Sequence, residues 1–268
     1  MMRTLRLTIA YDGTNYHGWM YHASVSTVQG AIQAAIEKIA AGRPFELLGS
    51  SRTDAGVHAL GQVARLRMDS AIPTDALARA IQAGLPGDIQ IRNVEEVPES
   101  FHPIQDTLRK RYRYLLHDGP RPELFLRNYL WRMGKKTVRL DVDAMRSAAN
   151  VLLGKHDFSA FENVGSPREH SVRTILDIDV RRGVPEGEFL LPLTGVPEDI
   201  LSIEVEADGF LYNMVRNLAG TLAEVGRKRL SADGMADILQ SRDRSRAGMT
   251  APPQGLFLLW IQFRESGF

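Results

Sequence analysis

The sequence predicts a mixed α/β (α+β) fold made of two ferredoxin-like units. The first half of the chain has the pattern strand, helix, strand, strand, helix, strand, which is the ferredoxin-like order. The second half repeats this coarse order, and Pro98 and Pro103 bracket an irregular stretch between the halves. We therefore expect domains at residues 1–104 and 105–268. Their sheets, largely antiparallel, can join around a central cleft.

In the first half, alternating apolar residues predict strands and apolar stripes predict helices. Leu5, Leu7 and Ile9 alternate with polar residues, as in a half-buried strand. A helix is expected after Thr27, and Gly42 is expected to close it. The strands are predicted at residues 5–9, 45–49, 64–68 and 88–97, and the helices at residues 28–39 and 74–81.

The second half shows the same two kinds of pattern. Leu176, Ile178 and Val180 alternate with charged residues, so they are expected on the buried face of one strand. Arg216 lies off the apolar stripe of its helix. Strands are predicted at residues 111–117, 176–180, 203–205 and 256–263, helices at residues 141–153 and 215–225, and a surface insertion at residues 181–198.

Composition excludes several kinds of chemistry. The 268 residues are 44% hydrophobic and 24% charged, as in an ordinary globular protein. The absence of cysteine excludes disulfides, thiolate zinc sites and cysteine nucleophiles. The seven histidines show no metal-binding spacing, so no metal is expected. No apolar run is long enough to span a bilayer, and residues 1–7 lack the apolar core of a signal peptide. The sequence therefore predicts a cytoplasmic protein.

Positive charge is clustered although the net charge is only +1. The clusters lie at residues 109–114, 227–229 and 242–246. The first includes Arg109, Lys110 and Arg111 and interleaves its cations with tyrosines, which suits phosphate contact and base stacking. The last cluster is predicted to be a solvated basic face.

The most informative motif is Arg-Thr-Asp-Ala-Gly-Val-His at residues 52–58. In an extended chain, Arg52 and Asp54 point to the same side of the backbone. The guanidinium can keep the carboxylate charged and also bind an anionic substrate. Gly56 allows a sharp turn. A surface turn with an idle ion pair is an equally good interpretation of this motif alone.

Many ordered blocks give the chain a resemblance to the pseudouridine synthases, most closely to the TruA-type enzymes that modify transfer RNA. The resemblance runs over residues 8–262. Its carriers, besides residues 52–59, are Tyr11-Asp12-Gly13-Thr14, Gly18-Trp19, Thr27-Val28-Gln29, Gly61-Gln62-Val63, Phe101-His102, Arg111-Tyr112-Arg113-Tyr114, Leu153-Gly154-Lys155-His156-Asp157-Phe158, Arg173-Thr174-Ile175, Met214-Val215-Arg216-Asn217, Ala251-Pro252 and Gly255-Leu256.

The resemblance implies roles for five residues. Asp54 matches the catalytic aspartate, which attacks either C6 of the base or C1′ of the sugar. Arg52 matches a residue that helps to extrude the base, and Tyr112 one that packs on it. Arg216 matches the basic partner of the aspartate, and Leu256 an apolar residue lining the pocket.

The resemblance also implies the reaction and its setting. The expected enzyme is an isomerase with the pseudouridine synthase fold, whose ferredoxin-like units are also described as RRM-like. It would convert uridine to pseudouridine at positions 38–40 of the anticodon stem-loop after flipping the base. It would need no cofactor, because nothing is oxidised and no group is donated. A homodimer is implied, with transfer RNA lying across both subunits.

Departures and rival interpretations remain. Ser50-Ser51, Met20 and Pro103 differ from the usual pattern, so the chemistry is a safer expectation than the target position. Asp12 and Asp157 fit turns or caps better than a carboxylate pair, and His58 fits a structural hydrogen bonder. The rivals are a synthase with another RNA target, a non-catalytic RNA-binding protein or folding helper for transfer RNA, and a hydrolase with an aspartate nucleophile. The hydrolase would need a second carboxylate to activate water.

Overall fold

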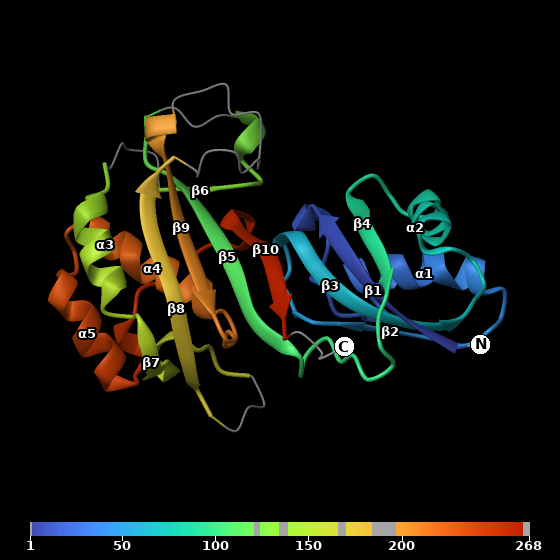
Figure 1. Ribbon diagram of the computed structural model, residues 1–268. Coiled ribbons are helices and arrows are strands. Elements are labelled where there is room, and N and C mark those ends of the chain that lie inside the picture. Colours follow the sequence, from blue (N-terminus) through green and yellow to red (C-terminus); the bar gives the residue numbers. More distant parts are fainter. Residues whose placement is uncertain (1, 121–123, 134–138, 166–169, 184–196, 265–268) are drawn as a thin grey trace. The chain divides into compact units, whose positions relative to one another are not determined.

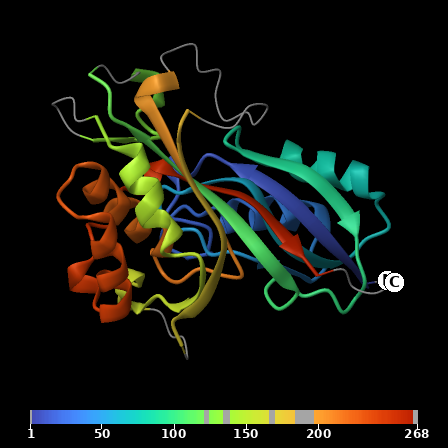
Figure 2. The same cartoon turned by 60° about the vertical axis from the view of Figure 1, so that its left-hand side comes forward.

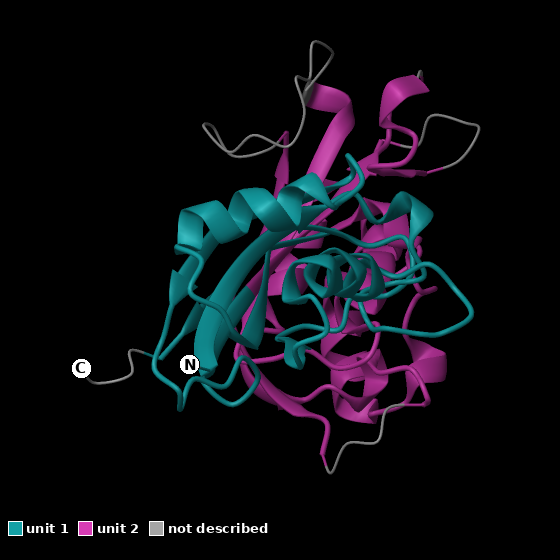
Figure 3. Cartoon of the chain, turned by 90° about the vertical axis from the view of Figure 1, so that its right-hand side faces the viewer, with its two compact units in different colours: residues 1–110, 257–268 teal, residues 111–256 magenta. Residues whose placement is uncertain are grey.

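The protein is described from a computed structural model covering residues 2–120, 124–133, 139–165, 170–183 and 197–264 (Figure 1). The chain forms two compact units (Figure 3). Unit 1 comprises residues 1–110 and 257–268, and unit 2 comprises residues 111–256. Both combine helices with mostly antiparallel strands, which confirms the predicted α+β class. No helix in the described ranges has the length and apolar character needed to cross a membrane.

Unit 1 begins with the predicted ferredoxin-like arrangement. Its strands follow the sheet order β4-β1-β3, and β2 pairs with β3; all of these pairings are antiparallel. The two helices contact each other, and α2 also packs against β4. The elements are β1 (Met2–Tyr11), α1 (Val28–Ala40), β2 (Phe45–Gly49), β3 (His58–Asp69), α2 (Thr74–Ala83) and β4 (Ile89–Glu96).

Local chemistry explains these boundaries. The alternating side chains of β1 bury Leu5, Leu7 and Ile9 completely. At the start of α1, the Thr27 hydroxyl accepts a hydrogen bond from the Gly30 N–H, as expected of an N-cap. The helix runs to Ala40, and Ala41 takes the left-handed cap position with φ of 50°, one residue before the predicted Gly42. Gly42 follows, also with positive φ.

A strand from the end of the chain completes the unit 1 sheet. β10 (Leu256–Phe263) pairs in parallel with β3, with Phe257 opposite His58. The same strand β3 pairs with β2 further along, over residues 64–68. Gly61 lies where β3 and β10 approach closely, since a Cβ there would be 2.5 Å from the Leu259 carbonyl oxygen. β10 therefore joins the sheet at His58, the last residue of the Arg-Thr-Asp-Ala-Gly-Val-His motif.

In the described part of unit 2, the helices α3, α4 and α5 lie on one side of the strands in both views (Figures 1 and 2). Its strand order is β5-β9-β8-β7, with the short β6 parallel to β5. The predicted strands and helices are all present, whereas α5, β6 and β7 were not expected. The elements are β5 (Thr107–His117), β6 (Trp131–Arg132), α3 (Val142–Asn150), β7 (Gly154–Asp157), β8 (Val172–Arg182), β9 (Ile200–Ala207), α4 (Met214–Gly226) and α5 (Ala232–Ser241).

The predicted burial of Leu176 on β8 was wrong. Leu176 is 48% exposed, and its neighbour Ile175 is buried instead. The register of β8 against β9 shifts between Ile175 and Asp177, so a bulge moves Leu176 off the core face. Residues 184–196 of the predicted insertion lie outside the described residues.

Candidate active site

The loop that carries the motif at residues 52–58 connects β2 to β3 in unit 1 and exposes alternate residues. Ser51 and Thr53 are buried, while Arg52 is exposed and Asp54 is half-buried. This is the pattern of an extended chain whose successive side chains lie on opposite sides. This pattern agrees with the prediction that Arg52 and Asp54 point to the same side of the backbone.

The buried side of this loop is held by hydrogen bonds. Gln62 is fully buried, and its amide donates to the Ser51 carbonyl oxygen at 2.7 Å and accepts from the Ser51 N–H at 3.2 Å. The Thr53 hydroxyl lies 2.7 Å from the Tyr11 hydroxyl. These bonds fix the backbone on the N-terminal side of Asp54.

The turn after Asp54 is held as well. The Asp54 carbonyl oxygen accepts from the Val57 N–H at 3.1 Å. Gly56 has φ of 76°, which confirms the predicted sharp turn, and its N–H donates to the Tyr16 carbonyl oxygen. Gly18 is required nearby, because a Cβ there would be 2.6 Å from the Thr53 carbonyl oxygen.

His58 and Asp12 have the structural roles expected of them. His58 is buried, its Nδ1 accepts from the Gly13 N–H at 3.0 Å, and its ring stacks on Phe257. The Asp12 carboxylate caps a short 3₁₀ helix by accepting from the Thr14 N–H. Asp157 also accepts locally, from the Ser159 N–H and hydroxyl, and so belongs to a turn.

Two cations at the start of β5 belong to the same unit. The Lys110 ammonium donates to the Ser50 carbonyl oxygen at 3.0 Å and to the Ser51 hydroxyl at 2.9 Å. The unusual Ser51 thus provides an extra acceptor for this lysine. Arg109 donates to the Gln262 side chain, and its guanidinium lies 5.8 Å from the centre of the Trp260 ring. Arg109 therefore contacts two side chains of β10, Gln262 and Trp260.

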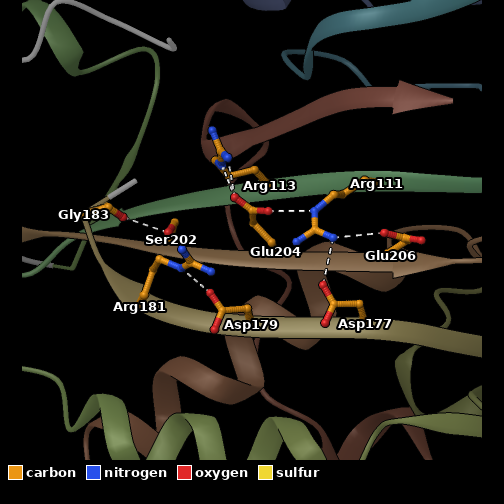
Figure 4. A network of polar contacts seen from close by, with 9 residues as sticks. All are labelled: Arg111, Arg113, Asp177, Asp179, Arg181, Gly183, Ser202, Glu204 and Glu206. Carbon is orange, nitrogen blue, oxygen red and sulfur yellow. Dashed lines mark hydrogen bonds and ion pairs between the residues drawn. The ribbon is translucent and has the colours of Figure 1, made fainter. Parts of the chain in front are cut away.

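In unit 2, Tyr112 lies between two arginines on β5. The Tyr112 ring is buried and meets the Phe210 ring edge-on, with centroids 5.0 Å apart. Its neighbours Arg111 and Arg113 both bind Glu204 on β9 (Figure 4). Because side chains alternate along a strand, the arginines share the side opposite Tyr112. The Glu204 carboxylate therefore holds β5 in place at the residues immediately before and after Tyr112.

The Arg111 guanidinium forms ion pairs with three carboxylates. Its guanidinium donates to Glu204 at 2.7 Å, Asp177 at 2.8 Å and Glu206 at 3.0 Å (Figure 4). A phosphate would have to compete with these acceptors. The geometry favours a structural role, and RNA contact by Arg111 stays a prediction.

Arg216 lies in the first turn of α4 and holds a segment that leads to Leu256. Its Nε donates to the Ala251 carbonyl oxygen at 2.7 Å, and its Nη1 to the Asn213 side chain at 2.8 Å. The Tyr114 hydroxyl donates to the next carbonyl, that of Pro252. Burial raises the pKa of Tyr114, and the positive charge of Arg216 opposes that shift.

Leu256 follows the short 3₁₀ helix Pro253–Gly255 and is buried. Gly255 is required there, because a Cβ would be 2.7 Å from the Tyr114 ring. Both core packing and pocket lining are compatible with this burial. Pocket lining therefore stays a prediction.

The predicted environment of one cation, Arg244, was wrong. Arg244 was expected on a solvated face, as Arg242 and Arg246 are, but it is half-buried and donates hydrogen bonds to four residues. Those partners lie as far away in sequence as Asn163. No local pattern distinguishes Arg244 from the exposed arginines beside it.

Comparison with known proteins identifies the family. A family model described as tRNA pseudouridine synthase matches residues 7–104 and 148–264. A protein named tRNA pseudouridine synthase A from Ruminiclostridium cellulolyticum is 44% identical over 263 residues, covering 98% of this chain and 100% of the relative. Relatives of the same name from Acetivibrio thermocellus and Thermoanaerobacter sp. (strain X514) are 43% and 42% identical, covering 98% and 97% of this chain and 100% and 99% of their own lengths.

The fold and these similarities define an RNA-modifying isomerase. The chain belongs to the tRNA pseudouridine synthase family.

Proposed function

We propose that this protein converts uridine to pseudouridine at positions 38–40 in the anticodon stem-loop of transfer RNA, with Asp54 as the nucleophile. The observation that carries the proposal is the loop in unit 1. Hydrogen bonds hold it before and after Asp54, while Arg52 is exposed and Asp54 remains accessible. A nucleophile must be held still in this way to meet its target.

The reaction needs no external reagent. The bond between C1′ and N1 of uridine breaks, the uracil rotates, and a bond forms between C1′ and C5. The proton at C5 is released and N1 gains one, so the product is an isomer. Asp54 attacks the nucleoside, at C6 or C1′, and leaves again before product release. This balance is the reason for proposing that no cofactor or metal takes part.

The other residues deal with the base and with water. Arg52 would help to extrude the uridine, at a cost of a few kcal/mol. Stacking on Tyr112, about 1–3 kcal/mol, would offset much of this cost. Arg216 would keep Asp54 ionised, and Leu256 would help to exclude water from the intermediate. Within unit 2, the Phe210 ring holds Tyr112, and the Ala251 carbonyl oxygen holds the Arg216 side chain. Because groups that act on a substrate must be held in place, these contacts support the assignments.

The decisive experiment uses transfer RNA labelled with tritium at C5 of uridine. Purified protein with EDTA and no added nucleotide is expected to release the label, and mapping is expected to place pseudouridine at positions 38–40. Modification elsewhere would indicate another RNA target, and free uracil would indicate a hydrolase. Absence of release from every transfer RNA tested would reject the proposal and leave binding or folding assistance to be measured.

Arg109 gives a test of the proposed phosphate contact. We expect Arg109→Gln to weaken transfer RNA binding and to reduce the slope of log Kd against log salt by about 0.7–0.9, the value for one lost phosphate contact. Filter binding at several salt concentrations measures this slope. Arg79→Gln is the control, because Arg79 is exposed on α2 and pairs with Asp75. An unchanged slope for Arg109→Gln would remove Arg109 from the RNA contacts.

We also propose a cytoplasmic homodimer that binds transfer RNA across both subunits. Leu124 and Phe125 of unit 2 support a contact with a second copy, because these adjacent apolar side chains are 67% and 80% exposed. Light scattering is expected to give twice the 29.9 kDa mass of one chain. Phe125→Glu is expected to shift the protein towards the monomer mass, and dimers as stable as the wild type would exclude this surface.

A further inference from the structure

Arg244 is a partly buried cation that hydrogen-bonds neutral groups. Its Nε donates to the Asn163 side chain at 3.0 Å, and its Nη1 to the Gly248 carbonyl oxygen at 2.9 Å. Its Nη2 donates to Asn217 and Thr250, both at 2.9 Å. Burial lowers the pKa of Arg244. This desolvation is offset by geometry, because a planar guanidinium presents several donors in fixed directions.

Asn217 is the buried centre of this set of contacts. Its amide nitrogen donates to the Phe161 carbonyl oxygen at 2.8 Å and to Asn163 at 3.0 Å. Its amide oxygen accepts from Arg244 and, at 2.7 Å, from the Thr250 hydroxyl. Both donors and both acceptor positions of the amide are therefore used. Asn217 follows Arg216 directly on α4.

The same contacts fasten residues 248–251 to α4. The Gly248 N–H donates to the Thr221 hydroxyl at 2.9 Å, and Thr250 binds Asn217. The approach is close, because a Cβ on Gly220 would be 1.8 Å from the Met249 carbonyl oxygen. At the end of this segment, Ala251 donates its N–H to the Arg216 carbonyl oxygen and accepts from the Arg216 side chain.

We infer that Arg244 is a positioning residue for Arg216. It clamps residues 248–251 against α4, so the Ala251 carbonyl oxygen holds the Arg216 guanidinium in its working direction. The inference rests on the proposed function, in which Arg216 keeps the nucleophile ionised. A misplacement of about 1 Å in such a group can cost about 100-fold in rate. Lysine cannot replace the fork of donors, so charge alone does not suffice.

The test separates chemistry from binding and folding. Single-turnover tritium release at saturating transfer RNA, filter-binding Kd and thermal unfolding are measured for each variant. We expect Arg244→Met and Arg244→Lys to slow release by about 10–100-fold while Kd stays within about twofold of the wild type. Arg246→Met is the matched control, since Arg246 is exposed two residues away, and it is expected to behave as the wild type.

A milder variant keeps the inference testable if Arg244→Met does not fold. Thr250→Val retains Arg244 and removes one hydroxyl, and a loss of about threefold to tenfold in the saturated rate is expected. A full rate in folded Arg244→Met or in Thr250→Val would overturn the inference while leaving the wild-type activity intact. A weaker Kd with an unchanged saturated rate would also overturn it. A wild-type enzyme that releases no tritium would instead reject the proposed function itself.

Discussion

Asp54→Asn is expected to abolish isomerisation while transfer RNA still binds. The amide keeps the size of the side chain but removes the anion that attacks the nucleoside. We expect single-turnover tritium release to fall by at least about 10⁴-fold, the scale seen when a nucleophile is removed. Kd by filter binding is expected to change by less than about threefold, because charge–phosphate contacts dominate affinity.

The matched control for this prediction is Asp75→Asn. Asp75 lies on α2 in the same unit, is 76% exposed and pairs with Arg79 one helical turn away. Loss of this surface carboxylate is expected to leave the rate unchanged. If Asp54→Asn turned over at the wild-type rate, Asp54 would not be the nucleophile, and a non-catalytic or differently catalysed function would have to be considered.

Glu204→Gln is expected to lower the free energy of unfolding by about 3–5 kcal/mol. Glu204 is 2% exposed and binds both Arg111 and Arg113, of which Arg113 is fully buried (Figure 4). The neutral amide would remove the carboxylate charge of Glu204 that offsets the desolvation of this buried guanidinium. Chemical denaturation followed by circular dichroism measures the change.

Asp177→Asn is the matched control, since Asp177 also binds Arg111 but is 52% exposed. We expect it to cost less than about 1 kcal/mol, because water screens the pair. The Glu204→Met/Arg113→Met double variant is expected to be more stable than Glu204→Gln, since removing both partners leaves no orphaned charge. Equal unfolding midpoints for Glu204→Gln and the wild type would show that the buried network does not stabilise unit 2.

Structural features that depend on local pattern could be predicted from the sequence. The alternation around Arg52 and Asp54 and the turn at Gly56 follow from the covalent geometry of consecutive residues. The N-cap role of Thr27 is equally local. The third helix of unit 2, α5, was missed although Ser231 caps it. Its apolar stripe consists only of Met235, Ile238 and Leu239, which is a weak periodic signal.

Contacts between distant residues could not be foreseen in this way. Arg111 belongs to a basic cluster by sequence, yet Glu204 and Glu206 engage it from another strand. Arg244 looks like its exposed neighbours, yet its partner Asn217 lies on α4. A charged side chain is either solvated or structural according to what packs beside it. For Arg111 and Arg244 these neighbours include residues tens of positions away in the sequence.

The chain's own order of residues was enough to specify its class, most of the succession of strands and helices, and the residues expected to carry the chemistry. These properties depend on side-chain periodicity and on chemical groups adjacent along the backbone. Folding decided which cations are engaged, that β10 pairs with β3, and that a bulge turns Leu176 outward. Such outcomes depend on pairing and burial between remote segments, whose free energies no single stretch of sequence contains.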